Sequence, residues 1–371
     1  MSWTQKTLGE IVNLKRGFDL PSSCRVDGPY PVFSSSGQTG THSEAAVKGP
    51  CVITGRYGTI GQVFYSDAAC WPLNTSLYST EFKGNDPKFV YYLLKTLPWR
   101  DYLTASAVPG INRNHVHLCP VCVPDYETQT AISGVLGSLD NKIELNTKLN
   151  GYLEELAALE FSRRFGEIES SIDLGKVLSI STKTLKPQNC HGEIWEHYSI
   201  PAYDANRRPV FELADGIKSN KYVIGANCIL ISKLNPSSRR IWMPACSSKR
   251  AVCSTEFIVY KPKNPVHKAF YYAAIGAPAF RDFLLAHVTG STGSRQRTQP
   301  KATLTYPIPN PGLEAVEDFC AFANPLYEQI KVNERNSKQL EELRDALLPK
   351  LMTGEIDVSK LDLKQLNSHL A

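Results

Sequence analysis

NKIELNTKLNGYLEELAALEF at residues 141–161 and EQIKVNERNSKQLEELRDALL at residues 328–348 are two versions of one helical segment. The tetrapeptide LEEL occurs in both, and Leu153 and Leu340, which begin it, lie 187 positions apart. Each version closes a longer region of short β-like runs that is rich in aromatic residues, glycine and proline. The chain is therefore predicted to contain a globular domain and a long helix twice, related by a pseudo-twofold axis.

The length of the chain agrees with this organisation. A chain of 371 residues exceeds what a single hydrophobic core usually holds, so two globular domains are expected. The predicted fold class is α+β, with two globular mixed α/β domains separated by two long antiparallel helices. The predicted segments are a first globular domain at 1–125, a central spacer helix at 126–168, a second globular domain at 169–310, a distal spacer helix at 311–356 and a C-terminal tail at 357–371.

The net charge of +5 is distributed unevenly along the chain. Residues 171–310 carry 19 basic and 8 acidic side chains, a net charge of +11, whereas residues 1–125 carry only +2. The helical segments 126–170 and 311–371 are each at −4. Basic globular segments are typical of proteins that bind a polyanion, so the acidic helices are expected to contact protein instead. A basic surface that is merely solvated is the alternative.

The ten cysteines are expected to be free thiols, because the first residues lack the apolar core of a signal peptide. No run of about 18 apolar residues occurs, so a cytoplasmic chain without a membrane span is expected. One cluster, His115-Val-His117-Leu-Cys119-Pro-Val-Cys122, contains a CxxC pair, but no second pair of zinc ligands follows it. The alternation in this stretch predicts a β-strand, and no metal site is predicted.

Motifs for nucleotide and methyl-donor chemistry do not occur in the sequence: it has no GxxxxGK[ST], no GxGxxG after a strand and no Asn/Asp-Pro-Pro-aromatic tetrapeptide. Asp67, Glu81 and Lys83 have the order of a Mg²⁺-dependent nuclease core, and a stand-alone nuclease or modification enzyme is the alternative function. However, STEF at 79–82 recurs at 254–257. This repeat indicates a strand of the scaffold, so no catalytic residue is predicted.

A second repeated feature is a helix near the end of each globular domain. FVYYLLKTLPWRDYL at 89–103 and AFYYAAIGAPAFRDFL at 269–284 share a Tyr-Tyr pair and an Arg-Asp-aromatic-Leu sequence at nearly the same separation. Because both domains contain this helix, its predicted role is structural. The loops between these repeated elements differ completely, so they are expected to carry specificity.

The variable loops contain the residue types that read bases. Arginine and lysine can bond O6 and N7 of guanine, and asparagine and glutamine can bond N6 and N7 of adenine. For any single residue, a solvated surface loop is the alternative. The candidate DNA-binding residues are Ser35, Ser36, Gly37, Gln38, Arg56, Tyr57, Asn112 and Arg113 in the first domain, and Lys233, Asn235, Arg239, Arg240, Arg295, Gln296, Arg297 and Lys301 in the second.

Both long helices have apolar residues at alternating spacings of four and three, which is typical of a coiled-coil seam. A second apolar stripe on each helix predicts further protein partners, with packing against the chain's own globular domains as the alternative. Polar residues interrupt both seams, and Asn146 and Asn333 are predicted to meet in a polar layer of an antiparallel pair. The candidate helix and subunit interface consists of Leu139, Ile143, Asn146, Leu153, Leu156, Leu326, Ile330, Asn333, Leu340 and Leu343.

Four segments together resemble a known family. LDNKIELNTKLNGYLEEL at 139–156, LEELRDALLPKLMTGEI at 340–356, GRYGTIG at 55–61 and WPLNTSLY at 71–78 are similar to the DNA-specificity subunit of type I restriction–modification systems. The resemblance covers essentially the whole chain, through about residue 356.

This resemblance implies two target-recognition domains, each of which reads one half of a split, asymmetric sequence in double-stranded DNA. It also implies that the two helices set the spacing between the half-sites and bind two methyltransferase subunits, with restriction–translocase subunits attached beyond. The chain itself would then catalyse no reaction. S-adenosylmethionine, ATP and Mg²⁺ are expected on the partner subunits, and no cofactor is expected on this chain.

Overall fold

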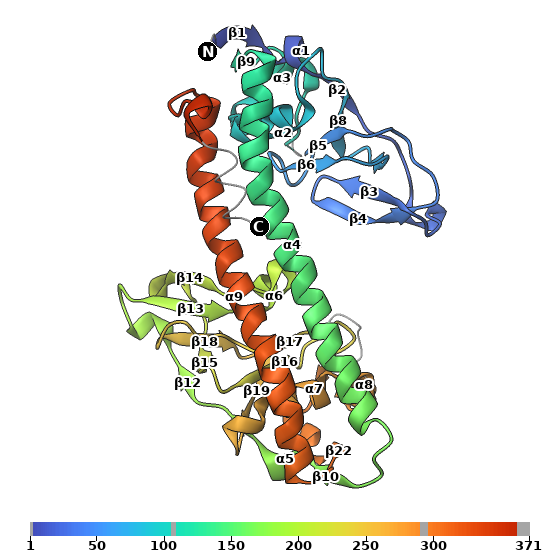
Figure 1. Ribbon diagram of the computed structural model, residues 1–371, viewed down its shortest axis with the longest axis vertical. Helices are drawn as coiled ribbons and strands as arrows, with labels where there is room; N and C mark the ends of the chain where they lie inside the picture. The colour runs from blue at the N-terminus through green and yellow to red at the C-terminus, as the bar shows by residue number, and fades with distance from the viewer. Residues whose placement is uncertain (1–2, 105–108, 290–295, 362–371) are drawn as a thin grey trace. The chain divides into compact units, whose positions relative to one another are not determined.

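The computed structural model describes residues 3–104, 109–289 and 296–361. It divides into two compact units (Figure 1): unit 1 is Met1–Asn146 with Asn336–Ala371, and unit 2 is Thr147–Arg335. Each unit contains one globular head and a part of each of two 40-residue helices, α4 (Tyr126–Phe165) and α9 (Leu313–Met352). The predicted fold class, two mixed α/β domains with two long antiparallel helices, is confirmed.

The first head extends from β1 to β9. Its elements in chain order are β1 (Trp3–Thr7), α1 (Leu8–Ile11), β2 (Asn13–Arg16), η1 (Ser22–Cys24), β3 (Tyr30–Ser34), β4 (Gly37–His42), β5 (Cys51–Gly55), β6 (Val63–Ser66), β7 (Trp71–Pro72), β8 (Ser76–Glu81), α2 (Pro87–Thr96), η2 (Trp99–Tyr102), α3 (Arg113–His117) and β9 (Pro120–Pro124).

A four-stranded antiparallel sheet in the order β2-β8-β5-β6 is the centre of the first head. All five residues of β5, CVITG, are buried, as expected for an inner strand that is covered on both faces. A second sheet has the order β4-β3-β7, with β3 and β7 parallel, and β1 pairs with β9. The loops that leave β5 and β3 are therefore anchored at their strand ends.

The second head extends from β10 to β22. Its elements in chain order are β10 (Ser171–Asp173), α5 (Leu174–Val177), β11 (Leu178–Ser181), β12 (Thr184–Leu185), η3 (Pro187–Asn189), β13 (Ile194–Tyr198), α6 (Ile200–Asn206), β14 (Val210–Leu213), η4 (Ala214–Gly216), β15 (Lys221–Val223), β16 (Ile229–Ser232), β17 (Ile241–Trp242), β18 (Ala251–Ser254), β19 (Phe257–Pro262), η5 (Pro265–His267), α7 (Lys268–Gly276), α8 (Pro278–Ala286), β20 (Val288–Thr289), β21 (Arg297–Thr298), η7 (Pro300–Thr305) and β22 (Pro307–Pro309).

The second head repeats the topology of the first. Its four-stranded sheet has the order β11-β19-β16-β17, and these strands correspond to β2, β8, β5 and β6 of the first head. The pair β10-β22 corresponds to β1-β9. Its second sheet, β12-β15-β18-β13-β14, keeps one parallel contact, between β13 and β18, but has five strands where the first head has three. The two heads therefore share a scaffold and differ in what is added to it.

This correspondence corrects the interpretation of the STEF repeat. In the first head, residues 79–82 end strand β8, whereas residues 254–257 form the turn between β18 and β19. Strand pairing decides the true equivalence, because Leu14 of β2 faces Ser79 while Ile180 of β11 faces Tyr260. The two STEF sequences are therefore not structurally equivalent, and their identity carries no information about the scaffold.

The two repeated helices are each shorter than predicted. Residues 89–103 divide between α2, which ends at Thr96, and the short η2, and residues 269–284 divide between α7 and α8. A proline lies directly after each break, Pro98 in the first head and Pro278 in the second. Proline lacks an N–H and disfavours helical geometry in the residue before it, so it ends the first helix.

Each head packs against its own part of the long helices. In unit 1, Ile132 and Leu136 of α4 and Leu351 of α9 belong to the main core of the first head. In unit 2, four phenylalanines, Phe161, Phe165, Phe270 and Phe319, surround one another with ring centroids 5.2–6.1 Å apart. Among the described residues, no helix is long and apolar enough to cross a membrane.

Candidate DNA interface and helix pair

Three predicted loop segments of the first head lie together. The loop after β5 is bonded to the segment before α3, since the Ile111 N–H donates to the Arg56 carbonyl (3.0 Å) and Tyr57 faces Gly110 in an antiparallel bridge. The β3–β4 turn is adjacent: a Cβ at Gly55 would lie 3.0 Å from the Ser35 carbonyl oxygen. The structure therefore brings together residues that are far apart in the sequence.

The Tyr57 side chain lies between the loop after β5 and the segment before α3 and contacts residues of both. A Cβ on Gly110 would lie 2.3 Å from the Tyr57 ring, so only glycine permits this close approach. The guanidinium of Arg56 lies over the same ring, 4.5 Å from its centroid, in a cation–π contact. Arg56 is thus restrained before any ligand binds.

These residues line a cleft of about 290 Å³, which we call the first cleft; its lining residues are Arg16, Arg56, Tyr57, Leu77, Thr104, Gly110, Ile111, Asn112 and Arg113. Three of them are arginines, and the described lining residues include no carboxylate. Such a cleft attracts polyanions. Arg16, at the end of β2, was missed by sequence reasoning because it belongs to a strand; its basic neighbour Lys15 was the only signal.

The remaining candidates of the first head lie in the β3–β4 turn. Ser36 and Gln38 are exposed, Ser35 is half-buried and Gly37 is buried against the Phe64 ring. Gly37 has a φ of 108°, a conformation that favours glycine, so its role is to form the turn. Of these four candidates, Ser36 and Gln38 have the most exposed side chains.

In the second head, two predicted loops are also joined by backbone bonds. The Thr298 N–H donates to the Lys233 carbonyl (3.0 Å), and the Asn235 N–H donates to the Gln296 carbonyl (2.9 Å). The Lys233 N–H donates in turn to the Glu256 carbonyl (2.9 Å). Lys233, Asn235, Gln296 and Arg297 therefore form one group, whereas the exposed Lys301 lies further along in η7. Arg295 is outside the described residues.

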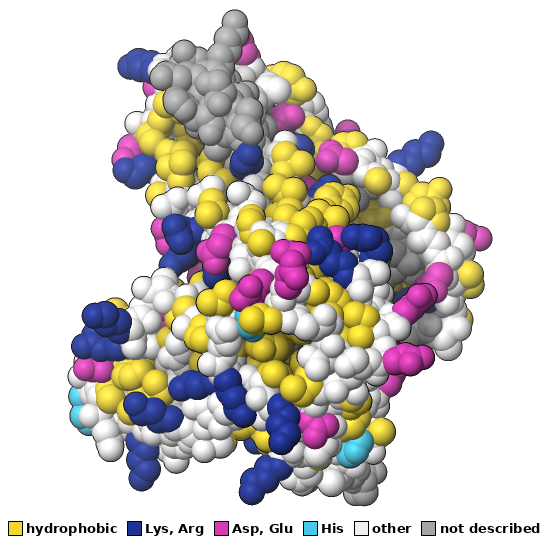
Figure 2. Space-filling model, turned by 60° about the horizontal axis from the view of Figure 1, so that its bottom comes forward, with side chains coloured by type: hydrophobic (Ala, Val, Ile, Leu, Met, Phe, Trp, Pro, Cys, Tyr) yellow, Lys and Arg dark blue, Asp and Glu magenta, His cyan; other side chains and the backbone are white. Residues whose placement is uncertain are grey.

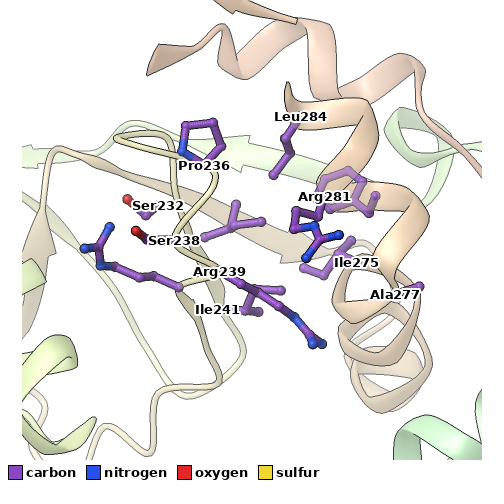
Figure 3. Close-up of a pocket in the computed structure, with 12 residues that line it drawn as sticks. Ser232, Pro236, Ser238, Arg239, Ile241, Ile275, Ala277, Arg281 and Leu284 are labelled. Atoms are coloured by element: carbon purple, nitrogen blue, oxygen red, sulfur yellow. The ribbon is translucent and has the colours of Figure 1, made fainter. Parts of the chain in front are cut away.

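Three candidate arginines of the second head have partners within it. Arg240 binds Asp204 through Nε (2.6 Å) and Nη2 (2.9 Å), and only 14% of its side chain is exposed. Arg297 binds Glu256 in the same two-bond manner, and Arg239 donates to the Gly276 carbonyl. Figure 3 shows residues 232–241 facing the helices that carry Ile275 and Arg281, around a cavity of about 10 Å³. Reading a base would require these arginines to exchange their partners.

Lysine and arginine side chains gather in the lower part of Figure 2, where the second head is in view. This agrees with the net charge of +11 over residues 171–310. An area of this kind attracts DNA phosphates without sequence preference.

The three residues of the alternative nuclease core are not gathered around one point. Strand β5 separates β6, which Asp67 follows, from β8, which ends at Glu81, so two strand spacings of about 5 Å lie between these residues. The Lys83 ammonium donates to the Gly9 carbonyl. The nuclease alternative is therefore not supported.

The histidine–cysteine stretch is not a single strand as predicted: it comprises the end of α3 and the strand β9. His117 has a structural role, since its Nε2 accepts the Leu14 N–H at 3.0 Å. Burial, aided by the nearby charges of Arg113 and Lys83, lowers the pKa of His117 and favours the neutral ring that this bond requires.

Within each unit, α4 and α9 are joined through a polar layer. In unit 1, Asn146 Nδ2 donates to Ser337 Oγ (3.1 Å); in unit 2, Asn333 Nδ2 donates to Asn150 Oδ1 (2.8 Å). Asn146, Asn333 and Ser337 are at most 5% exposed. The predicted direct Asn146–Asn333 contact is therefore wrong in its partners. In this antiparallel pair, Asn146 lies opposite Ser337, which is one helical turn after Asn333. Asn333 in turn lies opposite Asn150, which is one helical turn after Asn146.

The other predicted interface residues divide into two classes. Leu139 and Ile330 are buried, and Ile143, Leu153, Leu326 and Leu340 are half-buried. Leu156 and Leu343 are 46% and 43% exposed, so they face away from the seam.

Ion pairs connect the helices to each other and to the heads. In unit 1, Asp140 of α4 accepts from Arg344 of α9 (2.7 Å) and from the Tyr92 hydroxyl of α2 (2.6 Å). Burial, together with the Asp140 charge, raises the pKa of Tyr92, so this hydroxyl stays protonated and donates. In unit 2, Arg207 binds Glu154 of α4 through two bonds of 2.8 Å.

Helix α4 also carries an exposed apolar stripe, which we call the α4 stripe: Leu145, Leu149, Tyr152, Leu156 and Leu159, which are 43–67% exposed. These residues are spaced by four, three, four and three positions, the spacing of a coiled-coil seam. Leu159 also lines an apolar groove of about 830 Å³ between α4 and the α7–α8 corner of unit 2. A helix with this spacing fits another helix against its stripe.

Comparison with known proteins agrees with this architecture. Residues 1–155 match the family described as the type I restriction modification DNA specificity domain. The HindI specificity subunit of Haemophilus influenzae is 22% identical, over 95% of this chain and 99% of that protein. The MjaIX specificity subunit of Methanocaldococcus jannaschii is 25% identical, over 85% and 79% respectively.

A solved structure of the S subunit of a type I restriction–modification system from M. genitalium has the same fold. Its TM-score is 0.57 at 16% identity, over 94% of this chain and 96% of that chain. The matched domain, the two relatives and the shared fold make this chain similar, over most of its length, to type I restriction–modification specificity subunits.

Proposed function

We propose that the chain is the sequence-specific DNA-binding subunit of a type I restriction–modification complex and that it reads a bipartite, asymmetric target in double-stranded DNA. One observation carries this proposal: the two heads share one scaffold, yet the loops that they hold at corresponding strand ends contain different arginine, lysine and amide side chains. Two similar heads with different reading residues fit two different half-sites.

Two methyltransferase subunits bind the long helices, one of them at the α4 stripe, and restriction–translocase subunits join the assembly beyond them. The acidic character of both helices supports this division, because it makes them poor DNA ligands. The chain itself catalyses no reaction, the partner subunits hold S-adenosylmethionine, ATP and Mg²⁺, and the complex works in the cytoplasm.

Replacing Arg56 by alanine tests the DNA-reading role. The variant complex is expected to lose discrimination at one position of the first half-site, by about 1–3 kcal/mol, while the second half-site is read as before. The measurement is sequencing of the sites that the assembled methyltransferase modifies in a randomised DNA library. Lys48→Ala, which removes an exposed charge of the same head, is the control. An equal loss of affinity on all sequences would make Arg56 a phosphate contact and contradict its role as a reader.

The polar layers lead to a prediction about spacing. Replacing Asn146, Asn150, Asn333 and Ser337 together by leucine is expected to raise the free energy of unfolding, because buried polar layers cost stability and determine register. Without the polar layers, one helix can slip along the other. Each residue of slip moves a head by ~1.5 Å along the helix axis, and one base pair is ~3.4 Å long. The variant should therefore modify targets whose spacers are one base pair longer or shorter, which is measured on a set of spacer-length targets. Gln339→Leu, at an exposed position of α9, should change neither property; a quadruple variant with unchanged spacer preference would overturn this account.

A further inference from the structure

The loop after β5 in the first head and the loop after β16 in the second are held by the same backbone bonds. The Arg56 N–H donates to the carbonyl of Thr75, the residue before β8 (2.9 Å), and the Lys233 N–H donates to the carbonyl of Glu256, the residue before β19. Since β8 and β19 are equivalent strands, these two bonds are equivalent. Arg56 and Lys233 thus occupy one structural position.

A second bond extends the correspondence across the loop. The Arg56 carbonyl accepts from Ile111, and the Lys233 carbonyl accepts from Thr298, both at 3.0 Å. The bridges agree as well, because Tyr57 faces Gly110 and Leu234 faces Arg297. The next residue in each segment is then Asn112 or Gln299. Both have exposed side chains and stand directly before a helical turn, α3 or η7. Asn112 Oδ1 also caps α3 by accepting the Asn114 N–H (3.0 Å), which leaves its amide N–H groups and a second lone pair for a base.

We propose that both heads read DNA with the same two-position device, and that Lys233 and Gln299 determine specificity in the second half-site as Arg56 and Asn112 do in the first. This inference rests on the proposed function and deepens it. Each head then offers one cation, able to bond guanine, and one amide, able to bond adenine, held side by side by backbone bonds. The second head has lysine where the first has arginine, and glutamine where the first has asparagine. The two heads therefore present their hydrogen-bonding groups with different geometry to their half-sites.

Arg297 has a different role from Lys233 and Gln299. It occupies the position of Gly110, where the first head has no side chain at all, and it is bound by Glu256 through two bonds of 3.0 and 3.1 Å. Arg297 is a positioning residue that holds the segment carrying Gln299 next to the segment carrying Lys233. Within the part of the chain that the structure describes, the Gln299 side chain has one weak partner, since its Nε2 lies 3.5 Å from Thr289 Oγ1, so it can turn to a base.

The test uses the full chain assembled with its methyltransferase subunits and a randomised duplex library, from which modified sites are sequenced. Gln299→Ala and Lys233→Ala are each expected to reduce discrimination at one position of the second half-site by about 5- to 150-fold, with the first half-site unchanged. Gln299→Glu keeps the shape of the side chain and should shift preference from adenine toward cytosine, whose N4 donates to a carboxylate. Asn112→Ala should act on the first half-site alone.

Asn220→Ala and Lys218→Ala are the matched controls, since both are exposed residues of the second head between η4 and β15. They should leave both half-sites as in the unaltered chain. The proposal is overturned if Gln299→Ala and Gln299→Glu retain the original preference, or if they weaken modification equally on all sequences. Failure of the unaltered complex to modify any bipartite target would instead refute the proposed function itself, so the two failures can be told apart.

Discussion

Placing glutamates at Tyr152 and Leu156 of the α4 stripe is expected to remove one of the two methyltransferase subunits from the assembled complex. These side chains are 67% and 46% exposed. Burying an apolar side chain of this size against a partner contributes about 1.5–3 kcal/mol, so losing two weakens the contact by at least about 100-fold. Native mass spectrometry of the mixed subunits should then show one methyltransferase subunit per chain instead of two.

The control for this experiment is Leu118→Glu, because Leu118 is a leucine of the first head that is 71% exposed and lies outside both helices. It should leave the composition of the complex unchanged. The thermal unfolding of the isolated chain should be the same for both variants, since exposed positions contribute little to stability. Retention of both methyltransferase subunits by the double glutamate variant would disprove the docking role of the α4 stripe.

The second large effect is expected from Arg344→Ala in unit 1. The substitution removes the Arg344 guanidinium from Asp140, a carboxylate whose side chain is 28% exposed. Among the described residues, the other partner of this carboxylate is the Tyr92 hydroxyl. Breaking a buried ion pair from one side costs about 3–5 kcal/mol. Because this pair is partly exposed, we expect a loss of about 2–3 kcal/mol in the free energy of unfolding.

Urea denaturation followed by tryptophan fluorescence measures this loss. Arg163→Ala is the matched control: Arg163 also pairs with a carboxylate on a long helix, Glu160, but 70% of its side chain is exposed. A change of less than about 1 kcal/mol is expected there, because exposed ion pairs contribute little. Equal destabilisation by the two substitutions would show that the Asp140–Arg344 pair does not connect α4 to α9 in the way proposed.

The sequence by itself determined the features that depend on local periodicity. The duplicated layout and the two long helices follow from apolar spacings that are read along a single segment, and both are present in the structure. The polar interruptions at Asn146 and Asn333 were visible for the same reason. The partners of these asparagines were not visible in the sequence, because the register of an antiparallel pair depends on both helices at once. In the structure, this register places Asn146 against Ser337.

Only the tertiary structure decided which loop residues form a site. Arg240 and Arg297 looked equivalent to Arg56 in the sequence, yet long-range contacts gave them Asp204 and Glu256 as partners. Gln299 looked like an ordinary loop residue. Gln299 corresponds to Asn112 through backbone hydrogen bonds between segments that are dozens of residues apart. The sequence does not predict those bonds, because nearly every residue has the same backbone N–H and carbonyl groups.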